Sequence, residues 1–324
     1  MTRRGWSLVH DDALVVRCDV AVEPVVEPWL PLHAATPRTE VPGAAAIDVT
    51  TMPRPIDEVE DSAEPLLRVD GVRAYAHGET LALVGVSGAR GAVALETRCA
   101  SLHLPPGDDA RVRGDAYSML TLASAFLLGR LGGALVHAAG VVDPVGRAWL
   151  LVGDTHAGKT TTCVSLVDAG WRWLADDQVV LRFGDAESGT VDVQGWPRRA
   201  HLDEGWRDAV VTGTRGTMDL RERWGDRWLA RAPLGGVLLP GVDADAPTRA
   251  RRIDEASAFA ALVRQSPWLM ADRGAAPAVM SLLRATASCA SLAVSLGRDG
   301  YARGDVLAER LGSALRDPGF GSPD

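Results

Sequence analysis

The fold of this chain is decided by the stretch Leu150–Thr162, which reads LLVGDTHAGKTTT. Within it, Gly153–Thr160 matches the pattern G-x-x-x-x-G-K-[ST], whose glycines let successive backbone N–H groups turn toward phosphate oxygens. An apolar run of strand length precedes the loop, and a run compatible with a helix, Lys159–Ala169, follows it. A helix that starts directly after such a loop adds free N–H donors and its dipole. The pattern therefore predicts a binding site for a nucleoside triphosphate, ATP together with Mg²⁺.

Each position of the loop has an expected role. Lys159 is expected to reach the β- and γ-phosphates, and the Thr160 hydroxyl is expected to ligate Mg²⁺. His156 is either a tolerated variable position, since histidine accepts unusual backbone angles, or a phosphate contact. The nucleotide-binding residues expected here are Gly153, Asp154, Thr155, His156, Ala157, Gly158, Lys159, Thr160 and Thr161.

The lysine of this loop is the only lysine in the chain, whereas the other 33 of the 34 basic residues are arginine. Codon bias can replace lysine by arginine wherever either residue will serve. An ammonium group is a compact point charge and a guanidinium is a planar fork, so the two are not exchangeable at a tight phosphate site. The survival of Lys159 therefore indicates a position that needs an ammonium group.

An acidic pair, Asp176-Asp177, follows an apolar segment shortly after the loop. Adjacent carboxylates can divide two tasks: one accepts a proton from an attacking hydroxyl and the other helps to hold Mg²⁺. Alone, the pair would be an ordinary acidic turn, but beside a phosphate loop we favour the catalytic interpretation. His137 lies in an apolar run before the loop, where a hydrogen-bonded core histidine is the plainer interpretation.

The region after residue 110 alternates between strand and helix patterns, which is typical of an α/β domain with at least partly parallel strands. Strands are expected at 134–142, 148–152, 171–175, 178–183 and 292–296, and helices at 116–132, 159–169, 253–263, 276–285 and 304–315. Leu104–Asp109, rich in Pro, Gly and Asp, marks the expected domain boundary. We therefore expect a smaller strand-rich N-terminal domain over 1–110 and a catalytic domain over 111–324.

The first 110 residues show short apolar runs, such as Ala13–Val16 and Thr80–Val86, separated by turn residues. The proline-bearing segment Glu23–Arg54 is expected to be extended loop. The region either recognises a substrate or covers the edge of a sheet. The sequence leaves both roles open.

Three segments together resemble a known family: His137–Gly140, Leu150–Thr162 and Gly170–Val180, the last reading GWRWLADDQVV. They are similar to the catalytic domain of HPr kinase/phosphorylase, and more closely to the HPr-kinase-like proteins encoded beside lasso-peptide and other natural-product genes. The later segment Gly195–Leu202 resembles the "Pro-Arg…Leu" segment of that group. The resemblance covers roughly 130–205 and implies a phosphoenolpyruvate-carboxykinase-like fold.

The resemblance also implies an activity and roles for residues. It implies phosphoryl transfer to a serine hydroxyl, with Lys159 and Thr160 on phosphate and Mg²⁺, Asp176 as general base, and Asp177 assisting the metal or substrate. His137 would lie near these groups, and Arg198 or Arg199 would contact the nucleotide or the transferred phosphate. His156 stands where the family usually has glycine, and the signature segment of the bifunctional enzyme is not recognisable. Phosphorolysis, and HPr as the substrate, are therefore not expected.

The sequence thus favours a kinase that acts on a serine or threonine hydroxyl of a peptide, a protein or a small molecule. A lasso-type precursor peptide is one such acceptor. A nucleotide-binding regulatory module and a simple NTPase without an acceptor remain as alternatives. The acceptor and the oligomeric state, including a homo-oligomer, are left open by the sequence.

Composition limits the remaining classes. The net charge of −8 argues against a general nucleic-acid binder. Met119–Val136 is apolar but interrupted by Arg130, so a buried helix is expected and no membrane partner. The N-terminus does not read as a signal peptide. Four scattered cysteines suggest free thiols in a cytoplasmic protein, without zinc or disulfides.

Overall fold

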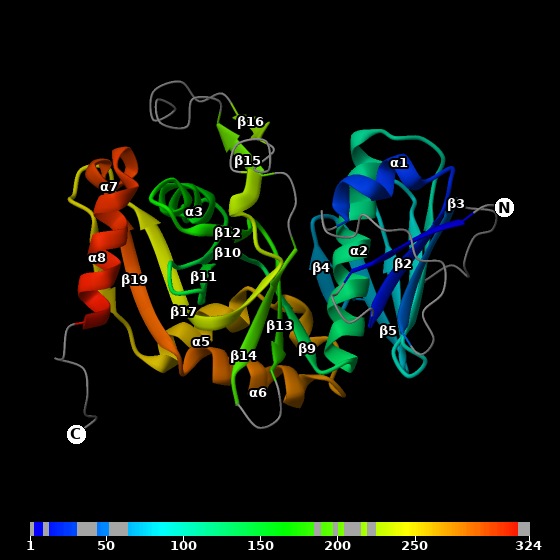
Figure 1. Cartoon of the computed structure of the whole chain (residues 1–324). Helices are drawn as coiled ribbons and strands as arrows, with labels where there is room; N and C mark the ends of the chain where they lie inside the picture. The colour runs from blue at the N-terminus through cyan, green and yellow to red at the C-terminus, as the bar shows by residue number, and fades with distance from the viewer. Residues whose placement is uncertain are drawn as a thin grey trace. The chain divides into compact units, whose positions relative to one another are not determined.

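The computed structural model describes residues 3–8, 13–30, 44–51, 64–184, 189–196, 200–203, 215–218 and 225–316. The chain has a mixed α/β architecture with two multi-stranded sheets (Figure 1). Two compact units divide the chain: unit 1 comprises 1–135 and 267–279, and unit 2 comprises 136–266 and 280–324. Among the described helices, none combines the length and apolar character that crossing a membrane requires.

Unit 1 contains an eight-stranded sheet in the order β1-β2-β3-β8-β7-β6-β5-β4. The pairs β2–β3 and β3–β8 are parallel and the others are antiparallel. The strands are β1 (Arg3–Ser7), β2 (Leu14–Asp19), β3 (Ala45–Thr51), β4 (Leu67–Val69), β5 (Val72–His77), β6 (Thr80–Val84), β7 (Arg90–Ala94) and β8 (Cys99–Leu104). The predicted strand-rich character of this region is confirmed.

The expectation of extended loop over Glu23–Arg54 is wrong where the structure describes that segment. It contains α1 (Glu23–Val26), the 3₁₀ turn η1 (Glu27–Trp29) and the strand β3. Ile47 and Val49 of β3 are fully buried, which is the environment that β-branched residues favour. The prolines of this segment concealed a strand whose partners, β2 and β8, lie elsewhere in the sequence. Residues 31–43 lie outside the described residues.

The long helix α2 (Ala110–Arg130) packs against strands β8, β7 and β3 of unit 1. The Asp109 carboxylate caps its first turn by accepting from the N–H groups of Arg111 and Val112. Asp115, on the next turn, accepts from Val86 N at 3.1 Å and Ser87 N at 2.7 Å. The apolar run Met119–Val136 is therefore a buried helix as far as Arg130, as predicted, whereas its last four residues form a strand. Its contacts tie it to unit 1, so the unit boundary falls at 135/136, whereas the sequence expectation placed it at 110.

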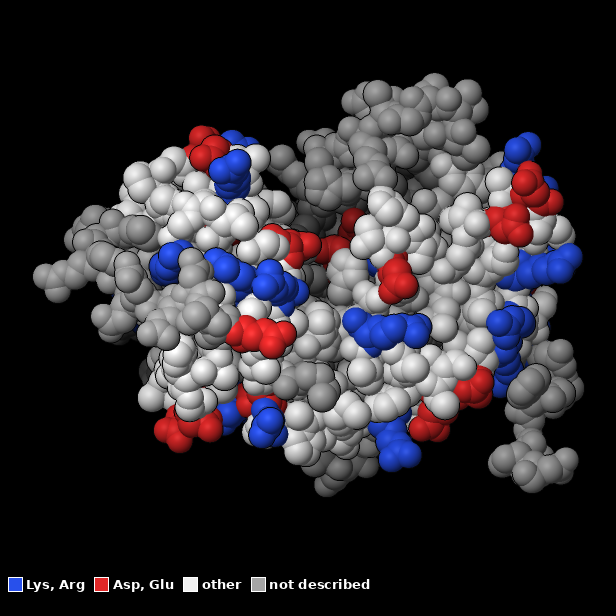
Figure 2. All heavy atoms as spheres, turned by 180° about the vertical axis from the view of Figure 1, so that it is seen from behind, with Lys and Arg blue, Asp and Glu red and all other residues white. Residues whose placement is uncertain are grey.

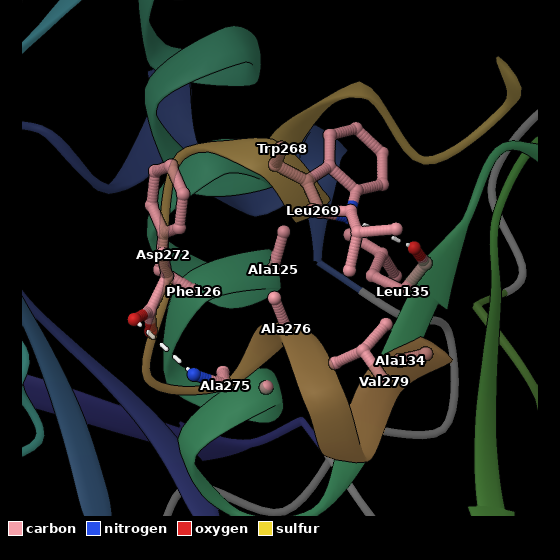
Figure 3. A pocket seen from close by; sticks show the side chains of 11 residues that line it. Ala125, Phe126, Ala134, Leu135, Trp268, Leu269, Asp272, Ala275, Ala276 and Val279 are labelled. Atoms are coloured by element: carbon pink, nitrogen blue, oxygen red, sulfur yellow. Dashed lines mark hydrogen bonds between the residues drawn. The ribbon is translucent and has the colours of Figure 1, made fainter. Parts of the chain in front are cut away.

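A segment from late in the chain completes unit 1. Asp272 receives two hydrogen bonds from the Arg130 guanidinium at the end of α2, at 2.7 and 2.8 Å. Trp268, in the 3₁₀ turn η3 (Pro267–Met270), donates its indole N–H to the Leu135 carbonyl at 3.0 Å (Figure 3). Between these contacts lies an apolar cavity of about 20 Å³. That is room for about one water molecule, too little for an organic ligand.

Unit 2 follows β9 (Gly133–Val136), along which the chain passes from one unit to the other. Its strands run in the order β12-β10-β11-β17-β14-β13, with β19 also on β17 and β18 on β19. The β11–β17 and β17–β19 pairs are parallel, which confirms the predicted partly parallel α/β sheet. The strands are β10 (Ala138–Val142), β11 (Ala148–Val152), β12 (Arg172–Ala175), β13 (Val179–Phe183), β14 (Val191–Gly195), β17 (Arg231–Val242), β18 (Arg249–Arg252) and β19 (Ala290–Leu296), with a separate pair β15 (Ala200–Asp203) and β16 (Arg215–Met218).

The helices of unit 2 are α3 (Lys159–Asp168), α5 (Glu255–Arg264), most of α6 (Ala276–Ala287), α7 (Arg298–Ala302) and α8 (Gly304–Arg316), with the 3₁₀ turn η2 (Gly225–Arg227). Helix α3 packs against β10, β11 and β12 and also contacts α7 and α8. The predicted strand over 134–142 proves to be two strands, β9 and β10, with His137 between them. His137 leaves the strand pattern because its N–H donates to the Gln265 carbonyl at 3.0 Å.

Basic and acidic side chains are interspersed over the face drawn in Figure 2. The net charge of −8 is thus a small excess of acidic over basic residues, 42 against 34. A mixed surface of this kind favours solubility.

The four free cysteines differ in exposure, so their reactivity with a thiol reagent tests the fold. Cys18 and Cys163 are buried and Cys99 is exposed. Burial raises the pKa of the Cys18 thiol to about 12, with the nearby Glu23 and Asp19 charges adding to the effect. We expect a thiol reagent at pH 8 to modify Cys99 first, and Cys18 and Cys163 only after unfolding, because the thiolate is the reactive form.

Peptide mapping of the modified protein measures that order, and Cys99→Ser removes the fast phase as a control. Rapid modification of Cys18 in the folded protein would contradict the burial of β2.

The contact between Arg130 and Asp272 gives a second prediction. Asp272→Ala should lower the free energy of unfolding by about 2–3 kcal/mol, since it leaves Arg130 Nε and the N–H groups of Gly274 and Ala275 without their acceptor, while Glu79 still accepts from the other end of the guanidinium. Urea unfolding measures the change. Asp245→Ala, which breaks the exposed Arg298–Asp245 pair on the surface, is the matched control and should change nothing measurable.

Candidate active site

The register of three strands brings the predicted site residues of unit 2 to one edge of the sheet. β10 lies between β11 and β12 and is antiparallel to both. Ala138, at the start of β10, is opposite Val152 at the end of β11, and Gly140 is opposite Ala175 at the end of β12. The residues just beyond these positions are the loop from Gly153, the pair Asp176-Asp177, and His137. Segments far apart in sequence therefore converge at one place.

The loop itself is shaped by two residues with positive φ. His156 has φ 66° and Gly158 has φ 91°. Gly158 is the N-cap of α3, and its carbonyl accepts from Thr162 N at 2.9 Å, so the helix begins directly at Lys159. A loop that ends in a left-handed residue and opens into a helix directs N–H groups toward the same space, which suits an anion. Of the two interpretations of His156, the backbone angle supports a position that accepts an unusual conformation.

The Lys159 side chain folds back onto its own loop. Its ammonium group donates to the carbonyls of Gly153 at 2.8 Å and Asp154 at 3.1 Å. Burial lowers the pKa of Lys159, while the charges of Asp177, Asp176 and Asp154 oppose that shift. The cation is thus held beside a concentration of carboxylates, where a positive charge is needed for balance.

His137 and the acidic pair lie against each other. His137 Nδ1 is 3.2 Å from Asp177 Oδ1, and both side chains are about one-third exposed, at 29% and 33%. Asp176 is buried, and its charge, after burial itself, helps to raise the pKa of Cys163 on α3. The two carboxylates therefore occupy different environments: Asp176 is buried within electrostatic range of Cys163 on α3, and Asp177 is one-third exposed and contacts His137.

The exposure of the remaining loop residues also differs. Asp154, Thr155 and His156 are exposed, whereas Ala157, Thr160 and Thr161 are half-buried. Arg198 and Arg199, which the resemblance placed near the transferred phosphate, lie outside the described residues.

One residue that the sequence analysis missed also belongs to this edge. Gln265 donates from its side-chain amide to Asp154 Oδ1 at 2.9 Å and accepts from His137 N at 3.0 Å. It lies 111 positions from Asp154, at the end of α5, and no local pattern singles it out. Only the tertiary fold connects it to the loop.

No family model matches this chain, and no curated protein matches it. Among solved structures, the chain is similar to the structure of the Hpr(Ser) kinase/phosphatase from Coxiella burnetii. The sequence identity is 17%, the TM-score is 0.27, and the aligned part covers 37% of this chain and 70% of that chain. The function is therefore inferred from the geometry of the loop and its neighbours.

Two glycines with nearly equal φ angles allow the shape of the loop to be tested. A Cβ at Gly158 would lie 2.5 Å from Val242 Cγ2, whereas a Cβ at Gly146, with φ 88°, would meet nothing within 4 Å. Gly146→Ala should cost about 1–2 kcal/mol from the backbone alone. Gly158→Ala should cost more, because the clash with Val242 adds to the same backbone strain. Urea unfolding compares the two variants, and equal losses would show that the loop is not packed against β17 in this way.

Proposed function

We propose that this protein is a kinase that transfers the γ-phosphoryl group of ATP to a serine or threonine hydroxyl. The observation that carries the proposal is the convergence of a left-handed glycine loop, the only lysine, and an acidic pair at one edge of the unit 2 sheet. Phosphoryl transfer needs positioning and charge stabilisation more than covalent chemistry, and these residues supply both.

In the proposed complex the triphosphate lies along the loop, between its backbone N–H groups and the start of α3. The Lys159 ammonium group leaves the carbonyls of Gly153 and Asp154 and binds phosphate oxygens instead. A compact ammonium group suits this movement within one loop. Its partial burial strengthens the interaction with the phosphates, since the local dielectric constant is low. The carboxylates around the lysine would repel the triphosphate. A divalent cation bound between them and the phosphates removes that repulsion.

The residues present fit Mg²⁺ by their donor chemistry. Mg²⁺ prefers oxygen ligands and usually takes only one or two from a protein, with phosphates and waters completing its shell. Thr160 on the first turn of α3 and Asp177, two residues after β12, offer a hydroxyl and a carboxylate. The cation, when bound, neutralises charge on the β- and γ-phosphates.

Asp176 is the proposed general base. It accepts the proton of the acceptor hydroxyl while the new bond forms between that oxygen and the γ-phosphorus. The bond from the γ-phosphorus to the β,γ-bridging oxygen breaks, and ADP carries away the electron pair. His137 is proposed to hold Asp177 in place through the Nδ1–Oδ1 contact at 3.2 Å.

The proposed acceptor is a peptide, a protein or a small molecule that bears the hydroxyl. A lasso-type precursor is one such peptide. Arg198 and Arg199 are proposed to contact the nucleotide or the transferred phosphate, which suits the donor fork of arginine. Residues 1–110 are proposed to recognise this acceptor. The alternative role for these residues is to cover the edge of a sheet.

Incubation with γ-labelled ATP and candidate acceptors tests the proposal. Lys159→Ala should weaken nucleotide binding by more than about tenfold, and Asp176→Asn should retain binding but reduce label transfer by about 10²–10⁴-fold. Asp192→Asn, at the far end of the β13–β14 pair, makes the same chemical change as a control and should keep full transfer.

Other results would identify other functions. Release of phosphate without labelled acceptor would indicate a simple NTPase, and tight binding with neither product would indicate a regulatory module. Full nucleotide affinity in Lys159→Ala would overturn the assignment of the loop.

A further inference from the structure

We infer that Gln265 is a positioning residue that keeps the phosphate loop in its binding shape. The inference rests on the proposed function, because the shape in question is the one that receives the triphosphate. Gln265 lies at the C-terminal end of α5, where its own N–H donates to the Ala261 carbonyl at 3.1 Å. Its position is thus fixed by the helix and not by the loop.

Gln265 makes two contacts with the site through two different groups. Its amide Nε2 donates to Asp154 Oδ1 at 2.9 Å, and its backbone carbonyl accepts from His137 N at 3.0 Å. Only 9% of Gln265 is exposed. A buried amide is costly unless it is hydrogen-bonded, so the side chain is committed to this geometry. One residue therefore fixes both the loop and the backbone that carries His137.

The Asp154 contact matters because of what else Asp154 holds. Its carbonyl accepts from the Lys159 ammonium at 3.1 Å and from Ala157 N at 3.1 Å. When Lys159 moves to the phosphates, the first turn of the loop loses the cation that bound its carbonyls. The Gln265 contact does not depend on the lysine, so it retains the turn through that exchange. A loop ordered before binding loses less entropy on binding.

The hydrogen bond from Gln265 to Asp154 also fixes the direction of the Asp154 carboxylate. Asp154 is exposed in the loop, and its carboxylate would repel a triphosphate if it turned toward the nucleotide. The Gln265 amide holds Oδ1 toward the end of α5. Replacing this donor should therefore weaken nucleotide binding in two ways, by loosening the turn and by freeing the carboxylate.

An exchange of donor and acceptor tests the inference. Gln265→Glu places a second carboxylate against Asp154, and nucleotide binding should weaken by about tenfold. Adding Asp154→Asn reverses the bond, so that the Asn amide donates to the Glu carboxylate with the net charge of the original protein. The double variant should recover to within about threefold of the original affinity, since residues in direct contact couple. A structural loss alone would not be repaired by this reversal.

The measurement is the dissociation constant of a fluorescent ATP analogue with Mg²⁺, together with the thermal midpoint of each variant. Ala260→Glu, at an exposed position of α5, adds the same charge and should leave affinity unchanged. Gln265→Met keeps a side chain of similar length without a hydrogen-bond donor or a charge, and it should also weaken binding. It serves as the test if Gln265→Glu does not fold.

The outcomes separate the two proposals. If Lys159→Ala loses nucleotide binding while Gln265→Glu and Gln265→Met bind as the original protein does, the positioning role is wrong and the nucleotide site stands. A double variant that is no better than Gln265→Glu also overturns the positioning role. If Lys159→Ala binds nucleotide as tightly as the original protein, the nucleotide site fails and the role of Gln265 falls with it.

Discussion

The antiparallel placement of β10 between β11 and β12 is the constraint on which the site in unit 2 depends. Because β10 runs opposite to both neighbours, its first residue and their last residues meet at one edge of the sheet. The loop after β11, the acidic pair after β12 and the histidine before β10 are therefore neighbours without any long side chain reaching across. All five residues of β10 and the last three of β12 are buried, so these strands are packed on both faces. The hydrophobic residues of these strands thus fix the spacing of the polar residues beyond them.

Two opposing effects act on the protonation of Lys159, the lysine of the loop. Burial favours the neutral amine, whereas three carboxylates favour the ammonium form. Two carbonyls satisfy its donors in the meantime. Arginine would bring a wider, planar group to a pocket formed by the carbonyls of two consecutive residues. This accounts for the one lysine in a chain that otherwise uses arginine.

The sequence predicted the parts of the fold that local patterns determine. The strand Ala148–Val152 and the helix beginning at Lys159 were anticipated with their bounds nearly correct, because a glycine loop separates two distinct periodicities. β3, which reads AAIDVTT, was missed because it lies within a proline-bearing segment and because its pairing with β2 and β8 cannot be read from local sequence. Gln265 could not be found for a similar reason, since nothing within its own helix reveals a contact with Asp154.

The return of residues 267–279 to unit 1 has a consequence for how the protein is made. Until these residues leave the ribosome, Arg130 lacks Asp272, and the apolar side of α2 that Trp268 and Ala275 cover stays open. By that time the whole of 136–266, most of unit 2, has already been synthesised. Domains usually fold in the order of synthesis, with the N-terminal one first. Here the N-terminal unit is finished late, so during translation an incomplete apolar surface must persist while its neighbour is already forming.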